Sequence, residues 1–257
     1  MLPKPKTTTR PFIPDQMYSP HTRGCFDVFL RCLLILIILS VASAAWGKTT
    51  PTAVAGDTQM RQHIIAEAEQ MKKTDPEKYQ DFINVATFIR KENRKQHGLV
   101  SVIVAKAITD HVHDNFRYRS AEHRLNFLSL LMGIIKIESG YNPRALSNKN
   151  ARGLMQVHYP TWGRYFNSQQ DAHTLHKNLA VGTGILRLYL NKSNNNLRRA
   201  LLMYLGASPS STKGEYNQYV DNVVYSAIKF KKNYTVRQPQ PNPAPPGFAM
   251  GKGGLRQ

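Results

Sequence analysis

Glu138 is the first residue whose type and position suggest chemistry. It lies at the end of an apolar helical segment, MGIIKIESG, which spans 132–140. Apolar neighbours disfavour a charged carboxylate through desolvation, and the negative end of the helix dipole disfavours it again. Both effects raise the pKa, and a carboxylic acid that stays protonated near neutral pH can serve as a general acid. From this spacing alone, a solvated glutamate at a helix end is the more ordinary interpretation.

The segments around and after Glu138 carry a more specific pattern. Residues 137–143 read IESGYNP, and they are followed by Ala145, Ser147, Ala151, the run GLMQV at 153–157, Pro160 and Thr161. This pattern resembles the catalytic signature of the soluble lytic transglycosylases, which share the goose-type lysozyme-like fold. The resemblance continues in the family's order through 178–190, 200–204 and 219–223, so it covers roughly 121–230.

The resemblance implies cleavage of the β-1,4 bond between N-acetylmuramic acid and N-acetylglucosamine in peptidoglycan, which leaves a 1,6-anhydromuramyl end. It also implies that Glu138 is the catalytic acid and then the base towards the substrate's own 6-hydroxyl. Hydrolytic glycosidases usually need two carboxylates, whereas no acid follows Glu138 until Asp171. A single carboxylate fits this chemistry, and no cofactor is expected.

Five further residues gain a substrate-binding role from the resemblance. Ser139 would orient the acid or the substrate, Gln156 would bind the sugar, and Met155 would line the cleft. Tyr204 would point its hydroxyl towards the reacting carboxyl or the sugar ring, and Tyr219 would support it. Two simpler interpretations stay open: Met155 as a core residue, and Tyr219 as a packing residue with a hydrated hydroxyl.

One position departs from the family pattern. Leu205 follows Tyr204 where the family usually has Asn. Loss of an amide that would contact sugar leaves subsite affinity and substrate preference open. It also motivates an alternative function: a lysozyme-fold peptidoglycan-binding or assembly module with weak or no turnover.

The histidines and cysteines predict no metal site. His111 and His113 are two residues apart on an expected helix and therefore face different sides. His173 and His176 could meet, but no third ligand is evident, so a solvated face is expected for both pairs. The two cysteines precede or begin the apolar N-terminal segment, which excludes cysteine chemistry from the body of the chain.

The candidate catalytic and substrate-binding residues are expected to be positioned by helices. Every long segment shows apolar residues at 3.6-residue spacing, and none alternates as a strand. The sequence predicts helices from Asp57, from Asp75-Pro76, over 100–116, 121–138, 160–168, 175–191, 196–206 and 214–231. The expected fold class is all-α: a lysozyme-like helical domain with preceding helices, an N-terminal membrane or signal segment and disordered termini.

The expected organisation has six parts. They are a flexible cytoplasmic tail (1–24), a signal anchor or signal peptide (25–46), a linker (47–56), an N-terminal helical region (57–118), the catalytic domain (119–232) and a Pro/Gly-rich tail (233–257).

The apolar N-terminal segment predicts export. Its uncharged stretch, 32–47, is short for a membrane span, and extension to Phe26 includes Asp27 and Arg31. The same stretch also has the basic region and apolar core of a signal peptide. Cations before the apolar run predict a periplasmic body. A tether to the inner membrane through 26–46 and cleavage to a soluble form both stay open.

The charge is strongly positive and unevenly spread. The chain has 35 Lys and Arg against 16 Asp and Glu, for a net charge of +19, and 139–257 hold sixteen of the cations but only three acids. Such a surface predicts an anionic partner: nucleic acid, a membrane or an acidic polysaccharide. Export and the Glu138 pattern favour peptidoglycan strands, which carry peptide carboxylates, as this partner. They do not favour nucleic acid, so no nucleic acid is expected. The resemblance further suggests work beside an envelope-spanning secretion or conjugation machine.

Overall fold

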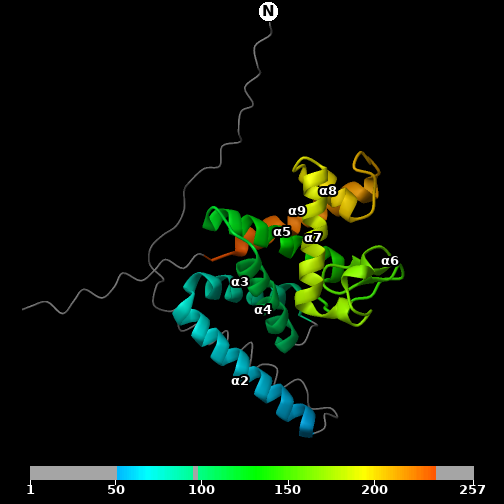
Figure 1. Cartoon of the computed structure of the whole chain (residues 1–257). Helices are drawn as coiled ribbons and strands as arrows, with labels where there is room; N and C mark the ends of the chain where they lie inside the picture. The colour runs from blue at the N-terminus through cyan, green and yellow to red at the C-terminus, as the bar shows by residue number, and fades with distance from the viewer. Residues whose placement is uncertain (1–50, 95–97, 236–257) are drawn as a thin grey trace, which may run out of the picture.

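The structure is a computed structural model that describes residues 51–94 and 98–235 (Figure 1). The expected cytoplasmic tail, the apolar segment at 26–46 and nearly all of the C-terminal tail lie outside the described residues. Within the described ranges, no helix is long and apolar enough to cross a membrane.

The described chain is mostly helical, as the sequence predicts. The helices are α2 (Pro51–Thr74), α3 (Pro76–Glu92), α4 (Gly98–Asn115), α5 (Ala121–Ser139), α6 (Tyr159–Trp162), α7 (Leu175–Lys192), α8 (Leu197–Tyr204) and α9 (Gly214–Asn233). Short 3-10 turns occupy Gly163–Tyr165 and Asp171–His173.

Two expected helices differ. Helix α2 begins at Pro51 rather than Asp57, so 51–56 of the expected linker are helical, and the helix expected over 160–168 is only the short α6 and a 3-10 turn. Two strands that the sequence did not predict, β1 (Ala151–Arg152) and β2 (Val157–His158), pair antiparallel. Strands of two residues are too short to show an alternating pattern.

Helix α5 runs through the core and packs along α9 (Figure 1). The two backbones approach closely at Gly133, where a Cβ atom would lie 2.4 Å from the Val223 carbonyl oxygen. The side chains of Leu131, Met132 and Ile135 on α5 are fully buried. This packing fixes the C-terminal end of α5, which carries Glu138.

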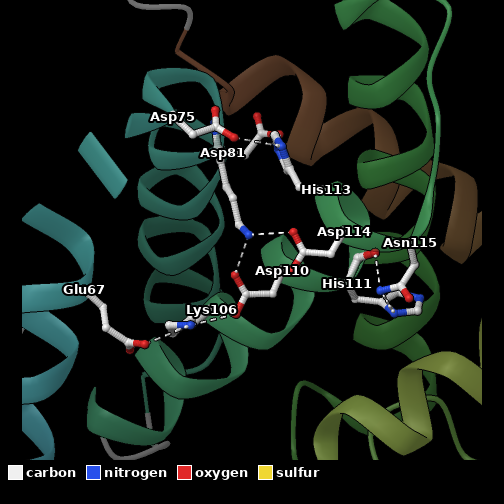
Figure 2. Close-up of polar contacts among 10 residues, drawn as sticks. Glu67, Asp75, Asp81, Lys106, Asp110, His111, His113, Asp114 and Asn115 are labelled. Carbon is white, nitrogen blue, oxygen red and sulfur yellow. Dashed lines mark hydrogen bonds and ion pairs between the residues drawn. The ribbon is translucent and has the colours of Figure 1, made fainter. Parts of the chain in front are cut away.

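Helices α2, α3 and α4 form a layer beside this core. A fully buried carboxylate, Asp81 of α3, accepts hydrogen bonds from Arg124 Nε (2.8 Å) on α5 and Tyr234 Oη after α9. His113 of α4 lies 2.8 Å from the same carboxylate (Figure 2). The layer is therefore joined to the core by buried polar contacts as well as apolar packing.

The solvated face expected for His111 and His113 is wrong. His111 is buried, and its Nε2 lies 2.9 Å from Thr183 Oγ1 on α7, while His113 is mostly covered beside Asp81 (Figure 2). Burial lowers the pKa of His111 to about 4, so its ring is neutral near pH 7. Their polar partners, Thr183 of α7 and Asp81 of α3, come from other helices, which spacing within α4 does not reveal. No group of three metal-ligating side chains gathers in the described ranges.

Candidate functional site

Glu138 stands at the last turn of α5. Ser120 begins this helix, because its Oγ accepts a hydrogen bond from the His123 amide at 3.2 Å. Gly140 ends it in the left-handed conformation, with φ of +58°. The chain leaves the helix axis at Gly140, two residues after Glu138, and the Glu138 side chain at this end of the core is only partly exposed.

Tyr219 of α9 contacts the carboxyl group. Its hydroxyl donates a hydrogen bond to Glu138 Oε1 at 2.5 Å. Burial raises the pKa of Glu138 to about 7, and the hydrogen bond from Tyr219 opposes that rise. Burial and the charge of Glu138 both raise the pKa of Tyr219, so this hydroxyl stays protonated and keeps donating. The pair can therefore hold a carboxyl group that both gives and accepts a proton near pH 7.

Tyr204 makes its hydrogen bond to the backbone and not to the carboxyl group. Its hydroxyl donates to the Met155 carbonyl oxygen at 2.9 Å, while Tyr219 reaches the carboxyl group instead. Tyr204 still lies close to the acid, because the charge of Glu138 adds to burial in raising the pKa of Tyr204. Tyr204 thus fixes the backbone at Met155, next to the reacting group.

The other three candidate substrate-binding residues differ in how far their side chains are exposed to solvent. Met155 is fully buried and packs against Gly182, which agrees with a core residue and not with a cleft-lining side chain. Gln156 is partly exposed, and its Nε2 donates to the carbonyl oxygens of Ala145 and Gly153, both at 3.1 Å. Ser139 is also partly exposed, and its Oγ donates to the Ile135 carbonyl oxygen at 3.2 Å.

Asn178 of α7 holds the loop that contains β1 and β2, a role that the sequence alone does not show. Its buried amide accepts a hydrogen bond from the Met155 amide and donates to the carbonyl oxygens of Arg152 and Ala172, all at 2.8 Å. Gly153 must lack a side chain here, because φ is +76° and a Cβ would lie 2.4 Å from Asn178 Nδ2. Asn178 lies within the family-like pattern, but its partners are distant in sequence, so spacing could not assign them.

Leu205 lies on the surface at the end of α8. The helix ends in a Schellman motif: Gly206 has φ of +86°, its amide donates to Met203, and the Ala207 amide donates to Leu202. The side chain of Leu205 is 38% exposed and directly follows Tyr204. An apolar side chain therefore faces solvent beside the residues that support the acid.

Comparison with known proteins identifies the region that holds this site. Residues 116–222 match the family model described as the transglycosylase SLT domain. The matched residues, called the SLT region below, include Glu138, Tyr204 and Tyr219.

A curated relative is the membrane-bound lytic murein transglycosylase C of Haemophilus ducreyi. It is 30% identical over 171 residues, which make up 54% of this chain and 47% of the relative. The chain thus spans about half the length of the curated relative that it matches. No solved structure gives a significant match. The SLT domain model begins at Phe116, so α2, α3 and α4 precede it.

Proposed function

We propose that this protein is a peptidoglycan lytic transglycosylase that cleaves the bond between N-acetylmuramic acid and N-acetylglucosamine. The observation that carries the proposal is the carboxyl group of Glu138, with a pKa raised to about 7 and a hydroxyl donor 2.5 Å away, inside the SLT region. A carboxyl group with that pKa is divided between its acid and base forms at neutral pH.

The reaction needs one carboxyl group acting twice. Glu138 donates its proton to the glycosidic oxygen, and the bond from that oxygen to C1 of the muramyl residue breaks. The carboxylate then accepts the proton of the muramyl 6-hydroxyl as that oxygen bonds to C1 and closes the 1,6-anhydro ring. Water is not consumed, and Glu138 ends as it began. The 6-hydroxyl belongs to the same sugar, so its effective concentration is high.

The neighbouring residues would support these two steps. Tyr219 orients the carboxyl group, and its hydrogen bond strengthens as the carboxylate forms. Ser139 and Gln156 are placed to contact the sugar, because both are partly exposed next to the acid or its loop. Met155 acts through its backbone, since its side chain is buried and its carbonyl oxygen is held by Tyr204.

Two observations support a proposal for the cellular location: the apolar N-terminal segment and the name of the curated relative. The relative's name describes a membrane-bound murein transglycosylase. We infer that this chain is exported to the periplasm and held at the inner membrane by 26–46, with cleavage to a soluble form as the alternative. An envelope-spanning secretion or conjugation machine is the kind of partner that such a local wall-opening enzyme would serve.

Digestion of purified peptidoglycan sacculi tests the activity. The full chain should release muropeptides with 1,6-anhydromuramyl ends, detected by mass spectrometry, and Glu138→Gln should release none. Glu215→Gln is the matched control, because Glu215 is an exposed carboxylate on α9 of the same domain. A wild-type chain that binds sacculi but releases nothing would contradict the proposal and support the binding or assembly module.

A further inference from the structure

We propose that an exposed basic corner between α7 and α8 binds the carboxylates of the peptide stems of peptidoglycan. The corner comprises Arg187, Lys192, Arg198 and Arg199. The enzyme would then favour peptide-bearing strands over bare glycan. This inference rests on the proposed function and names the part of the substrate that a second surface recognises.

The cations of the helical layer and its surroundings are largely neutralised. Lys78 lies within 3.0 Å of Asp110 and 2.8 Å of Asp114, and Lys106 within 2.7 Å of Asp110 (Figure 2). Arg124 forms ion pairs with Glu77 and Asp81. Lys136, Lys229 and Lys231 reach acids of α3 and α5. The acids that form ion pairs in the described part of the chain all lie within 67–122.

The cations between 140 and 213 are different. None of them forms an ion pair with a described residue, and the acids that the sequence offers after Glu138 are only Asp171, Glu215 and Asp221. Unpaired cations on one side of a molecule produce an attractive field for anions, and acids nearby do not cancel it here. The basic excess seen in the sequence is therefore a property of the SLT region's surface.

Four of these cations lie between 187 and 199, in the second half of α7 and at the start of α8. Lys192 ends α7, a turn over 193–196 reverses the chain, and Arg198 and Arg199 begin α8. All four side chains of the basic corner are exposed, and no acid occurs between the first and the last of them. Arg198 is held by hydrogen bonds to the Ser211 carbonyl oxygen and to Asn217. The other three side chains make no hydrogen bond or ion pair with the described residues.

The basic corner shares α8 with a residue that supports the catalytic site. Tyr204, which holds the Met155 backbone, lies five residues after Arg199 on α8, a rise of roughly 8 Å along the helix. A peptide stem a few residues long reaches about 10–14 Å when extended, which is longer than that rise.

The chemistry of the surface also fits a peptide. Leu188 and Leu205 are 37% and 38% exposed and lie on α7 and at the end of α8. They add exposed apolar groups to the helices that carry the cations, which suits a stem that combines carboxylates with small apolar side chains. A strand without stems keeps a lactyl carboxylate on each muramyl residue, but it lacks the peptide side chains and the carboxylates farther along the stem.

Charge reversal on two substrates tests the proposal. The triple variant Arg187→Glu, Lys192→Glu, Arg199→Glu is compared with a matched triple reversal, Lys73→Glu, Arg117→Glu, Arg119→Glu, at exposed cations of α2 and the loop before α5. The substrates are peptide-bearing strands and strands from which an amidase has removed the stems. The corner variant should lose about tenfold in initial rate on peptide-bearing strands at low salt. It should lose much less on bare strands, whose remaining carboxylates lie on the sugar itself, and the control should lose nothing on either.

Three outcomes would overturn the proposal. They are an equal loss on both substrates, no loss on either, and loss only of binding to vesicles of anionic lipid, which would assign the corner to a membrane. Sedimentation with sacculi, measured with the corner substitutions in a Glu138→Gln background, keeps the surface testable without turnover. If the wild type releases no anhydromuropeptides yet the corner substitutions still abolish sedimentation, the proposed function fails and the basic corner stands.

Discussion

At the scale of single residues, the carboxyl group of Glu138 must stay protonated near neutral pH and still remain able to lose its proton. Desolvation at the end of α5 raises the pKa of Glu138 to about 7, while a hydroxyl from α9 keeps the charged form attainable. A fully buried glutamate without that donor would bind its proton too tightly to act as a base. The balance between the two effects sets the pH range in which both proton transfers occur.

Removal of the Tyr219 hydroxyl should change that balance. The hydrogen bond from Tyr219 lowers the pKa of Glu138, so Tyr219→Phe should raise it and move the alkaline limb of the pH–rate profile to higher pH. In the wild type this limb should fall through about pH 7, as the acid form is lost. Loss of one charge-assisted hydrogen bond should also slow turnover by about fivefold to tenfold.

The pH–rate profile of anhydromuropeptide release measures both effects. Tyr225→Phe is the control, because Tyr225 is an exposed tyrosine on the same helix. A Tyr219→Phe profile that overlays the wild type would show that this hydroxyl does not act on the acid.

At the scale of elements, the loop that contains β1 and β2 depends on α7. The buried amide of Asn178 holds three backbone groups of the loop and its surroundings, and Gly153 leaves room for that amide. The loop in turn carries Met155, whose carbonyl oxygen binds Tyr204. The geometry beside Glu138 is thus set by a side chain that need not contact the substrate.

Gly153→Ala should damage this arrangement. The new Cβ would meet the Asn178 amide at 2.4 Å in a backbone conformation that alanine rarely adopts, so unfolding free energy should fall by about 2 kcal/mol or more. Urea unfolding followed by circular dichroism measures the change. Gly184→Ala is the matched control on α7, because nothing lies within 4 Å of its Cβ position and alanine is the better helix former, by about 0.8–1 kcal/mol. Equal stability of the two variants would refute the role of Gly153.

Local signals in the sequence predict the helices well and their mutual contacts poorly. Asp75-Pro76 predicts the start of α3, which is confirmed, because the Lys78 amide donates to Asp75 Oδ1 at 2.9 Å. The sequence does not show that Tyr219 rather than Tyr204 donates to the carboxyl group, since this depends on how α8 and α9 pack against α5. His111 appeared solvated for the same reason, as its partner Thr183 lies 72 residues away.

At the scale of the whole molecule, the helices before the SLT region are attached to it by buried contacts. Asp81 joins α3, α4, α5 and the residue after α9, and Asn84 exchanges two hydrogen bonds with the backbone of Thr235. His111 bonds to Thr183 on α7. The division of the chain at 118 and 119 remains a prediction about domains, but the two regions share one set of contacts.

Asp81→Asn should therefore destabilise the molecule as a unit. The substitution removes the negative charge that faces Arg124 and His113, and breaking a buried ion pair costs about 3–5 kcal/mol. A single cooperative unfolding transition at lower urea concentration is expected, with the SLT region and the preceding helices unfolding together. Asp221→Asn, at an exposed carboxylate of α9, should unfold like the wild type. Two separate transitions in Asp81→Asn would contradict the attachment.

The central claim is that Glu138 catalyses an intramolecular transfer to the muramyl 6-hydroxyl and not hydrolysis. The most direct measurement is digestion of sacculi by the full chain in water labelled with heavy oxygen, followed by mass spectrometry of the new muramyl ends. We expect anhydromuramyl ends that contain no label, and no products from Glu138→Gln. New reducing muramyl ends that carry one labelled oxygen would contradict the claim.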